Sequence, residues 1–404
     1  MNTILDNLKP CTGCSACSTV CPKDAISCRI DENGFYTATV NPEQCVNCGK
    51  CQHVCIKFLP SESMGIELTG AVLYSAQTKN EAVLKSCTSG GIAYELAEYG
   101  IENGYTVTGV VYDYSVQAAK AILLDDKTLS QSKGSKYLQA LTEECFREIV
   151  RTAKEKPNSK FMVFGTPCQI LGIKKSFEEN RFSNELITID LLCHGVPSYL
   201  MWNAYLQWLE KKHGVSRIDD IVFRSKKNGW HDFTMEILSD GKAYLKSSEY
   251  DLFYRAFFDN VLLNSSCLDC KVRQERSAAD IRLGDFWGKK YQDRQDGVSA
   301  VLCFTKEGQN LLDILNNKKR ISLSKEDILV DCLKNQSTRP YSVINLQSAA
   351  LESLKSGNPL VKVMKGYRKS FSVKRKLKLR LKEGTAYLPA KIRKKMRYIY
   401  RKSV

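Results

Sequence analysis

The chain opens with two copies of one cysteine pattern, and this pattern constrains the fold more than any other feature of the sequence. Each copy has four cysteines spaced C-x2-C-x2-C-x3-C, the first over residues 11–21 and the second over residues 45–55. This spacing is typical of the thiolates that bind cubane 4Fe–4S clusters. Zinc ribbons use separate C-x2-C pairs, and a disulfide framework needs an oxidising compartment. The spacing therefore predicts two iron–sulfur clusters.

The double run resembles that of bacterial dicluster ferredoxins, in which the fourth cysteine of each run binds the other cluster. The resemblance implies that one 4Fe–4S cluster is bound by Cys11, Cys14, Cys17 and Cys55. The other is then bound by Cys45, Cys48, Cys51 and Cys21. Residues 25–30 and 36–40 fit two short strands, which the turn Asp31-Glu32-Asn33-Gly34 would join as a hairpin.

The length of 404 residues is too great for one small core, so we expect two or three domains. No apolar run reaches the roughly 18–20 residues that span a bilayer, and the first residues show no signal-peptide pattern. In a cytosolic chain, 17 cysteines indicate metal and redox chemistry rather than disulfides. We therefore expect a cytoplasmic protein.

The net charge of +16 is a property of one end of the chain. Residues 361–404 hold 17 Lys and Arg residues and one acid, Glu383, so the rest is balanced. Ile392, Met396 and Ile399 recur there at helical intervals, which favours a basic amphipathic helix lying on an anionic membrane at its inner, cytoplasmic face. A disordered solubilising tail is the alternative. No nucleic-acid motif is found, so no nucleic-acid partner is expected.

From about residue 70 the sequence alternates between apolar, β-rich runs and helical periodicity. Strands are expected at residues 106–112, 160–164, 186–192 and 218–223, and helices at residues 92–103, 143–153 and 199–212. This alternation favours a sheet covered by helices. We predict a mixed α+β and α/β chain, made of a ferredoxin domain at 1–60, a linker at 61–69, an α/β domain at 70–345 and a basic helical tail at 361–404.

Four further cysteines suit a third four-thiolate site. Cys168 and Cys193 each follow a predicted buried strand, while Cys267 and Cys270 form a C-x2-C pair. Two strand ends and one loop could close such a site. From the spacing alone, inert buried thiols are the stronger alternative.

Five motifs follow one another along this part of the chain. They are KSCTSGG at 85–91, GSKY at 134–137, GTPCQ at 165–169, CHGVPS at 193–198, and the 267–270 pair followed by ADIRLGDFWG at 279–288. In this order they resemble the coenzyme F420 hydrogenase/dehydrogenase beta-subunit family over roughly residues 1–345. The resemblance implies an FAD-containing iron–sulfur domain with a third 4Fe–4S cluster near the flavin, held by Cys168, Cys193, Cys267 and Cys270.

Two of these motifs also suit a flavin nucleotide on physical grounds. Glycines at 90–91 let the backbone approach a phosphate, and the expected helix start offers free N–H groups, with Ser89 as its cap. An ordinary helix start and a solvated loop are the alternatives, and FAD is not distinguished from FMN. The predicted flavin contacts are Thr88, Ser89, Gly90, Gly91, Gly134, Ser135, Lys136, Tyr137, Gly165, Thr166, Gly284 and Asp285.

His194 is the candidate catalytic residue, because it adjoins the proposed ligand Cys193. It could tune a cluster by hydrogen bonding or protonate a substrate near the flavin. A purely structural histidine is the alternative.

These features favour an oxidoreductase that passes electrons between 4Fe–4S clusters and FAD and that reduces or oxidises an organic substrate. The tail, and a resemblance to bacterial polysaccharide-biosynthesis proteins, favour a lipid-linked or nucleotide-linked sugar as that substrate. One alternative is an electron-transfer subunit that serves a partner enzyme and has no substrate of its own. A cluster-based sensor that binds nucleic acid is a further alternative. The first two readings require a redox partner or electron donor.

Overall fold

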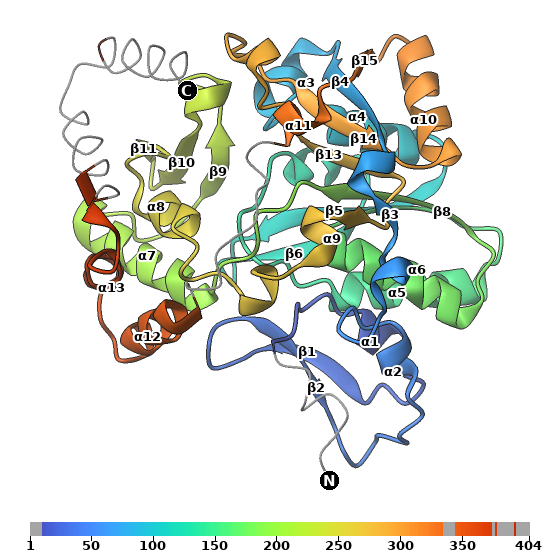
Figure 1. Cartoon of the computed structure of the whole chain (residues 1–404), viewed down its shortest axis with the longest axis horizontal. Helices are drawn as coiled ribbons and strands as arrows, with labels where there is room; N and C mark the ends of the chain where they lie inside the picture. Colours follow the sequence, from blue (N-terminus) through green and yellow to red (C-terminus); the bar gives the residue numbers. More distant parts are fainter. Residues whose placement is uncertain (1–9, 334–343, 374–375, 378–391, 393–404) are drawn as a thin grey trace.

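The computed structural model describes residues 10–333, 344–373, 376–377 and 392. The amphipathic helix expected at the basic C-terminal end therefore lies almost entirely outside the described residues. Figure 1 shows three regions: a small N-terminal module, a large sheet with helices on both faces, and a smaller sheet packed with helices. The prediction of a mixed α/β chain with a ferredoxin-like N-terminal region is confirmed.

The N-terminal module is built around a hairpin and two short helices. Its elements are α1 (Ala16–Thr19), β1 (Ile26–Ile30), β2 (Tyr36–Val40) and α2 (Lys50–His53). The expected strands pair antiparallel, and Asp31 closes the turn by accepting the backbone N–H groups of Asn33 and Phe35. Gly34 has a φ of 77° and no side chain, so the hairpin tip can lie against Ser198. The module is thus docked on the rest of the chain.

The segment expected as a linker is also held in place. It contains η1 (Ser61–Met64), β3 (Ile66–Glu67) and η2 (Leu68–Gly70). β3 pairs antiparallel with β12 (Arg276–Ser277), far away in the sequence. This pairing anchors the N-terminal module to the α/β region.

The large sheet has eight strands, and its centre is parallel. In spatial order they are β15 (Ile321–Glu326), β4 (Val72–Thr78), β14 (Ser299–Cys303), β13 (Ile281–Asp285), β8 (Glu185–Leu191), β7 (Lys160–Phe164), β5 (Tyr105–Asp113) and β6 (Ala118–Leu124). β5, β7, β8 and β13 run parallel, and the flanking pairs are antiparallel. Ligands of such sheets bind outside the carboxyl ends of the parallel strands.

Helices cover both faces of this sheet. On one face lie α4 (Ile92–Glu102) and α10 (Lys306–Asn317), and on the other lie α5 (Glu143–Glu155) and α6 (Pro167–Asn180). Successive residues of β7 show the division: Met162 packs with α4, whereas Phe161 and Val163 pack with α5 and α6. The expected helices at 92–103 and 143–153 are confirmed.

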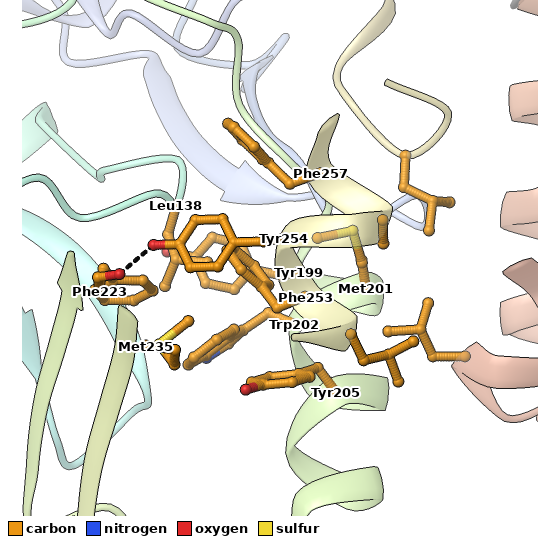
Figure 2. Close-up of a cluster of buried hydrophobic side chains, with 14 of the residues drawn as sticks. Leu138, Tyr199, Met201, Trp202, Tyr205, Phe223, Met235, Phe253, Tyr254 and Phe257 are labelled. Atoms are coloured by element: carbon orange, nitrogen blue, oxygen red, sulfur yellow. Dashed lines mark hydrogen bonds between the residues drawn. The ribbon is translucent and has the colours of Figure 1, made fainter. Parts of the chain in front are cut away.

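The strand expected at 218–223 forms, as β9 (Asp220–Ser225), but in a separate sheet. β9 pairs with β10 (Thr234–Ser239), and β10 pairs with β11 (Lys242–Ser247). Four helices pack around this sheet: α7 (Tyr199–His213), α8 (Leu252–Phe258), α12 (Ile344–Lys355) and α13 (Leu360–Arg368). Figure 2 shows the aromatic core in which Trp202 and Tyr205 of α7 lie against Phe253 of α8.

Part of the expected basic tail is well packed. α13 buries Leu360, Val363, Met364 and Tyr367 in the same core, and Phe371 follows them. Its lysine side chains are exposed, on a helix that the core holds in place. Within the described residues, no helix is both long and apolar enough to cross a membrane.

The remaining described elements are short. They are α3 (Glu81–Ser86), η3 (Leu129–Ser132), η4 (Trp230–Asp232), η5 (Ser265–Cys267), α9 (Lys271–Gln274), η6 (Lys289–Tyr291) and α11 (Leu329–Cys332). Several of them carry residues of the sites described next.

Candidate iron–sulfur and flavin sites

The first set of thiols lies around α1 and the turn after α2, with Cys14 and Cys17 buried and Cys11 and Cys55 half-buried. Burial raises the pKa of Cys17 well above its ordinary value, and Cys28, Cys14, Cys11 and Cys55 raise it further. Burial likewise raises the pKa of Cys55 to about 12, with added contributions from Cys14 and Cys11. Because Coulomb energy falls with distance, these mutual effects mean that the four predicted ligands lie together.

The second set lines a pocket at the outer end of the module. Its walls include Cys21, Cys45, Cys48 and Cys51, and the space is about 480 Å³, part of it open to solvent. Burial raises the pKa of Cys51, and the nearby Cys48, Cys21 and Cys45 add to the shift. Cys21 therefore lies with the second run and Cys55 with the first, which is the crossed arrangement expected.

The donor chemistry of both sets fits 4Fe–4S clusters. Each set supplies four thiols, and the backbone N–H groups of Gly13 and Ala25 each donate to a ligand sulfur, at 3.3 Å from Cys11 and Cys21. A thiol must lose its proton to bind iron, so cluster assembly releases protons. Among the described residues no three His, Cys, Asp or Glu side chains could hold a single metal ion, as distinct from a cluster.

A third set of thiols meets at the carboxyl end of the parallel strands. Cys168 follows β7 and Cys193 follows β8, while η5 and the turn before α9 bring Cys267 and Cys270. Burial raises the pKa of Cys168 well above its ordinary value, and Cys270, Cys14 and Cys193 raise it further. Burial raises the pKa of Cys270 to about 12, with contributions from Cys267 and Cys193. The four predicted ligands thus form one group.

A fully buried ion pair holds the backbone around this third set. Arg282 on β13 and Asp190 on β8 face each other in the sheet register, and two N–H···O bonds of 2.6 Å join them. Arg282 also donates to the carbonyl oxygens of Val272 at 2.8 Å and Arg276 at 3.2 Å. The pair therefore ties the segment after Cys270 to the strand that precedes Cys193.

The first and third sets are neighbours. Cys168 packs against the small core formed by Cys14, Ala16, Val20 and Val54. This approach depends on Gly172 of α6, because a Cβ there would lie 2.7 Å from the Cβ of Ala16 and 3.5 Å from the sulfur of Cys14. The contact places α1 directly on α6.

We expect Gly172→Ala to lower the free energy of unfolding by about 1–3 kcal/mol, because the added methyl group forces α6 away from α1. Gly366→Ala on α13 is the matched control, since nothing lies within 4 Å of its Cβ position. In α13 the same change should raise the free energy of unfolding by about 0.5–1 kcal/mol, because alanine favours a helix more than glycine does. Denaturant unfolding measures the free energy of unfolding of both variants. If it changes by the same amount and in the same direction in both, the packing argument is contradicted.

The two predicted flavin loops lie side by side. The backbone N–H of Ser135 donates to the Thr88 hydroxyl at 3.0 Å, and Gly134 lies beside the same hydroxyl. The prediction that Ser89 caps the following helix is wrong. The N-cap of α4 is Gly91, with a φ of 82°, and the Ser89 hydroxyl donates instead to the carbonyl of Val298 at 2.8 Å.

Four other predicted flavin contacts have structural partners. Thr166 caps α6 in a capping box and lies 3.3 Å from the Cys168 sulfur, and Gly165 packs on the same turn. Gly284 leaves room for Leu192, since a Cβ would lie 2.3 Å from that side chain. Asp285 pairs with Arg224 and accepts from the Trp230 indole at 2.6 Å. Gly165 and Thr166 thus belong with the third thiol set.

Two basic residues near the flavin loops were missed by sequence reasoning: Arg224 and Lys226. Lys226 donates to the carbonyls of Leu84, Ser89 at 2.9 Å and Asp296 at 2.6 Å, so it fixes the loop that contains Ser89. Burial lowers the pKa of Lys226 to about 8 and that of Lys136 to about 7. The only sequence signal was the basic residues that follow the strand expected at 218–223.

His194 lies between the third thiol set and the aromatic core. Its Nε2 is 2.8 Å from the Asn260 side-chain oxygen, and its ring packs against Phe257 at 4.7 Å between centroids. Phe257 also contacts Tyr137 of the second flavin loop at 5.3 Å. The histidine is therefore close to both candidate sites, while its catalytic role stays a prediction.

The fold and the thiol sets define an iron–sulfur protein of the oxidoreductase and electron-transfer class. Residues 10–57 match the model of the 4Fe-4S dicluster domain. Residues 158–328 match the family described as the C-terminal part of the beta subunit of coenzyme F420 hydrogenase/dehydrogenase. The resemblance stated from the sequence is thereby confirmed over these two ranges, a dicluster domain near the N-terminus and a later region that is similar to this family.

Two individual proteins show weaker similarity. An uncharacterized protein of Methanocaldococcus jannaschii is 24% identical over 187 residues, which are 40% of this chain and 51% of that protein. The chain thus spans about half the length of this curated relative. A chain from a structure of the F420-reducing [NiFe] hydrogenase complex of Methanosarcina barkeri, solved in a xenon-derivatization study, is 17% identical, with a TM-score of 0.44. The match covers 75% of this chain and 94% of that one.

Proposed function

We propose that the chain is an iron–sulfur flavoprotein oxidoreductase, which passes electrons between 4Fe–4S clusters and FAD and acts on an organic substrate. The observation that carries the proposal is the contact between Cys14 and Cys168, which brings a ferredoxin thiol set against a third set of four thiols. A third, half-buried set of thiols beside a ferredoxin module is of use if electrons go further into the α/β region. When bound, a flavin exchanges single electrons with clusters and electron pairs with organic molecules.

Each proposed cofactor has candidate ligands in this chain. Cys168, Cys193, Cys267 and Cys270 would hold the third 4Fe–4S cluster. The adjacent loops Thr88–Gly91 and Gly134–Tyr137 would hold the flavin, with Lys136 and Lys226 supplying positive charge. His194, whose Nε2 lies 2.8 Å from the side-chain oxygen of Asn260, would donate a proton near the flavin or tune the third cluster.

The substrate and partners are proposed on weaker grounds. The family that residues 158–328 match is named for a beta subunit, which supports a redox partner or electron donor for this chain as well. A lipid-linked or nucleotide-linked sugar of polysaccharide biosynthesis would suit a cytoplasmic protein whose basic tail contacts an anionic membrane. The second candidate is an electron-transfer subunit without its own substrate, which the open pocket of the second thiol set favours.

The iron, sulfide and flavin content of anaerobically purified protein tests the proposal. About twelve irons and one flavin per chain are expected for three 4Fe–4S clusters and a flavin. About eight irons without flavin would overturn it and leave a dicluster protein with a binding domain. Turnover that appears only when a partner enzyme is added would favour the electron-transfer subunit.

A further inference from the structure

Arg224, at the end of β9, is a buried cation with unused hydrogen-bonding capacity. Its side chain is 4% exposed, and its Nη1 pairs with Asp285. Its Nε and Nη2 are buried and have no hydrogen-bond partner among the described residues. An unsatisfied buried donor costs about 1–3 kcal/mol, and more when it is charged, so these two groups call for a ligand.

The geometry of the guanidinium identifies the kind of ligand. Nε–H and Nη2–H project in parallel from one edge, and such a fork binds the two oxygens of a carboxylate or phosphate together. The rest of Arg224 is fixed: Asp285 holds Nη1, and the rings of Phe233 and Trp287 lie 4.6 and 5.1 Å from the guanidinium carbon. The fork is therefore held in one orientation, and its Nε–Nη2 edge, close to Tyr137, has no hydrogen-bond partner among the described residues.

The surroundings have an excess of positive charge. Lys136 donates to the carbonyls of Gln131 at 2.7 Å and Lys133 at 2.9 Å, and Lys226 is likewise held by carbonyls. Tyr137 links this region to Arg224, because burial raises the pKa of Tyr137 while the nearby guanidinium opposes the shift. Arg224 is buried and Lys136 and Lys226 are half-buried, whereas the carboxylates named for Arg224 and Lys226 are those of Asp285 and Asp296. An anionic ligand at the Arg224 guanidinium would add to the balance of this positive charge.

We propose that the Nε–Nη2 fork of Arg224 binds a phosphate group of the flavin nucleotide, with Asp285 as the residue that positions the fork. The inference rests on the proposed flavin site. It adds that the Arg224 guanidinium is the group that selects phosphorylated flavins. Riboflavin has the same ring system without phosphate, so it should gain nothing from Arg224. Asp285 would then not touch the flavin, although the sequence predicted that it does.

The test compares the affinities of riboflavin, FMN and FAD for flavin-depleted full-length protein that retains its clusters. Arg224→Lys keeps the charge and removes the fork, so we expect FMN and FAD to bind at least ten-fold more weakly and riboflavin to bind unchanged. Arg294→Lys, on the exposed pair with Asp296, is the control and should bind all three as the wild type does. Equal weakening of all three flavins, or no weakening of any, overturns the phosphate assignment.

Inorganic pyrophosphate separates this inference from the proposed flavin site. If the wild type binds pyrophosphate but no flavin, and Arg224→Lys weakens pyrophosphate ten-fold, the fork assignment holds and the flavin proposal fails. If the wild type and Arg224→Lys bind flavins equally, the flavin proposal holds and the fork assignment fails. A wild type that binds none of the four probes overturns both. If the Arg224→Lys protein does not fold, the Asp285→Asn protein is measured in its place. It must then bind FMN and FAD more weakly than the wild type and bind riboflavin unchanged.

Discussion

Cys168→Ala protein is expected to bind about eight irons per chain where the wild type binds about twelve. Cys168 is one of four thiols in the third set, and the pKa effects of Cys270 and Cys193 on it place it within that group. A cube with three thiolates and a methyl group in place of the fourth lacks one of its four thiolate ligands. The dicluster module should keep its two clusters, because none of their ligands changes.

Anaerobic iron and sulfide determination measures this loss. Cys145→Ala is the matched control, since Cys145 is a buried thiol on α5 that packs among apolar side chains and belongs to none of the three sets. That variant should keep about twelve irons, as the wild type does. Equal iron in Cys168→Ala and wild type would show that Cys168 binds no cluster.

Arg282→Met is expected to lower the free energy of unfolding by about 3–5 kcal/mol, because it leaves Asp190 buried without its cation. Burial raises the pKa of Asp190, and the Arg282 fork and the Ser277 hydroxyl are what favour its charged form. The variant also removes the donors to Val272 and Arg276, so the backbone after Cys270 loses its anchor. We therefore expect the third cluster to be lost as well.

Two further variants separate these effects by denaturant unfolding and iron content. Arg282→Met combined with Asp190→Leu replaces the whole pair by apolar groups and should regain most of the stability, because no charge stays buried. It should not regain the iron, since the two carbonyls still lack a donor. Arg151→Met removes only an exposed pair with Glu148 and should cost about 0–1 kcal/mol. If Arg282→Met lowers the free energy of unfolding by less than Arg151→Met does, the argument from the buried pair is contradicted.

Local patterns explain what could be predicted from the sequence. The strands and turn of the N-terminal hairpin follow from residues that are adjacent in the chain, and they form as expected. The central helices and strands follow from their apolar periodicity. The sequence did not show that β9 belongs to a separate sheet, because periodicity identifies a strand but not its partners. Ser89 does not cap the helix for a similar reason, because its hydroxyl donates to the carbonyl of Val298, which is distant in the sequence.

By itself the sequence predicted the ligands of the two dicluster sites, because the first three thiols of each run follow one another with only two residues between them. Only the tertiary structure decided the rest of the site. It brings Cys168 and Cys193 to the loop of Cys267 and Cys270, and it sets Cys14 against Cys168. It also leaves the Nε–Nη2 edge of Arg224, beside the flavin loops, without a hydrogen-bond partner among the described residues. These relations join residues from different strands and helices, and no spacing along the chain records which of them will meet when the sheet forms.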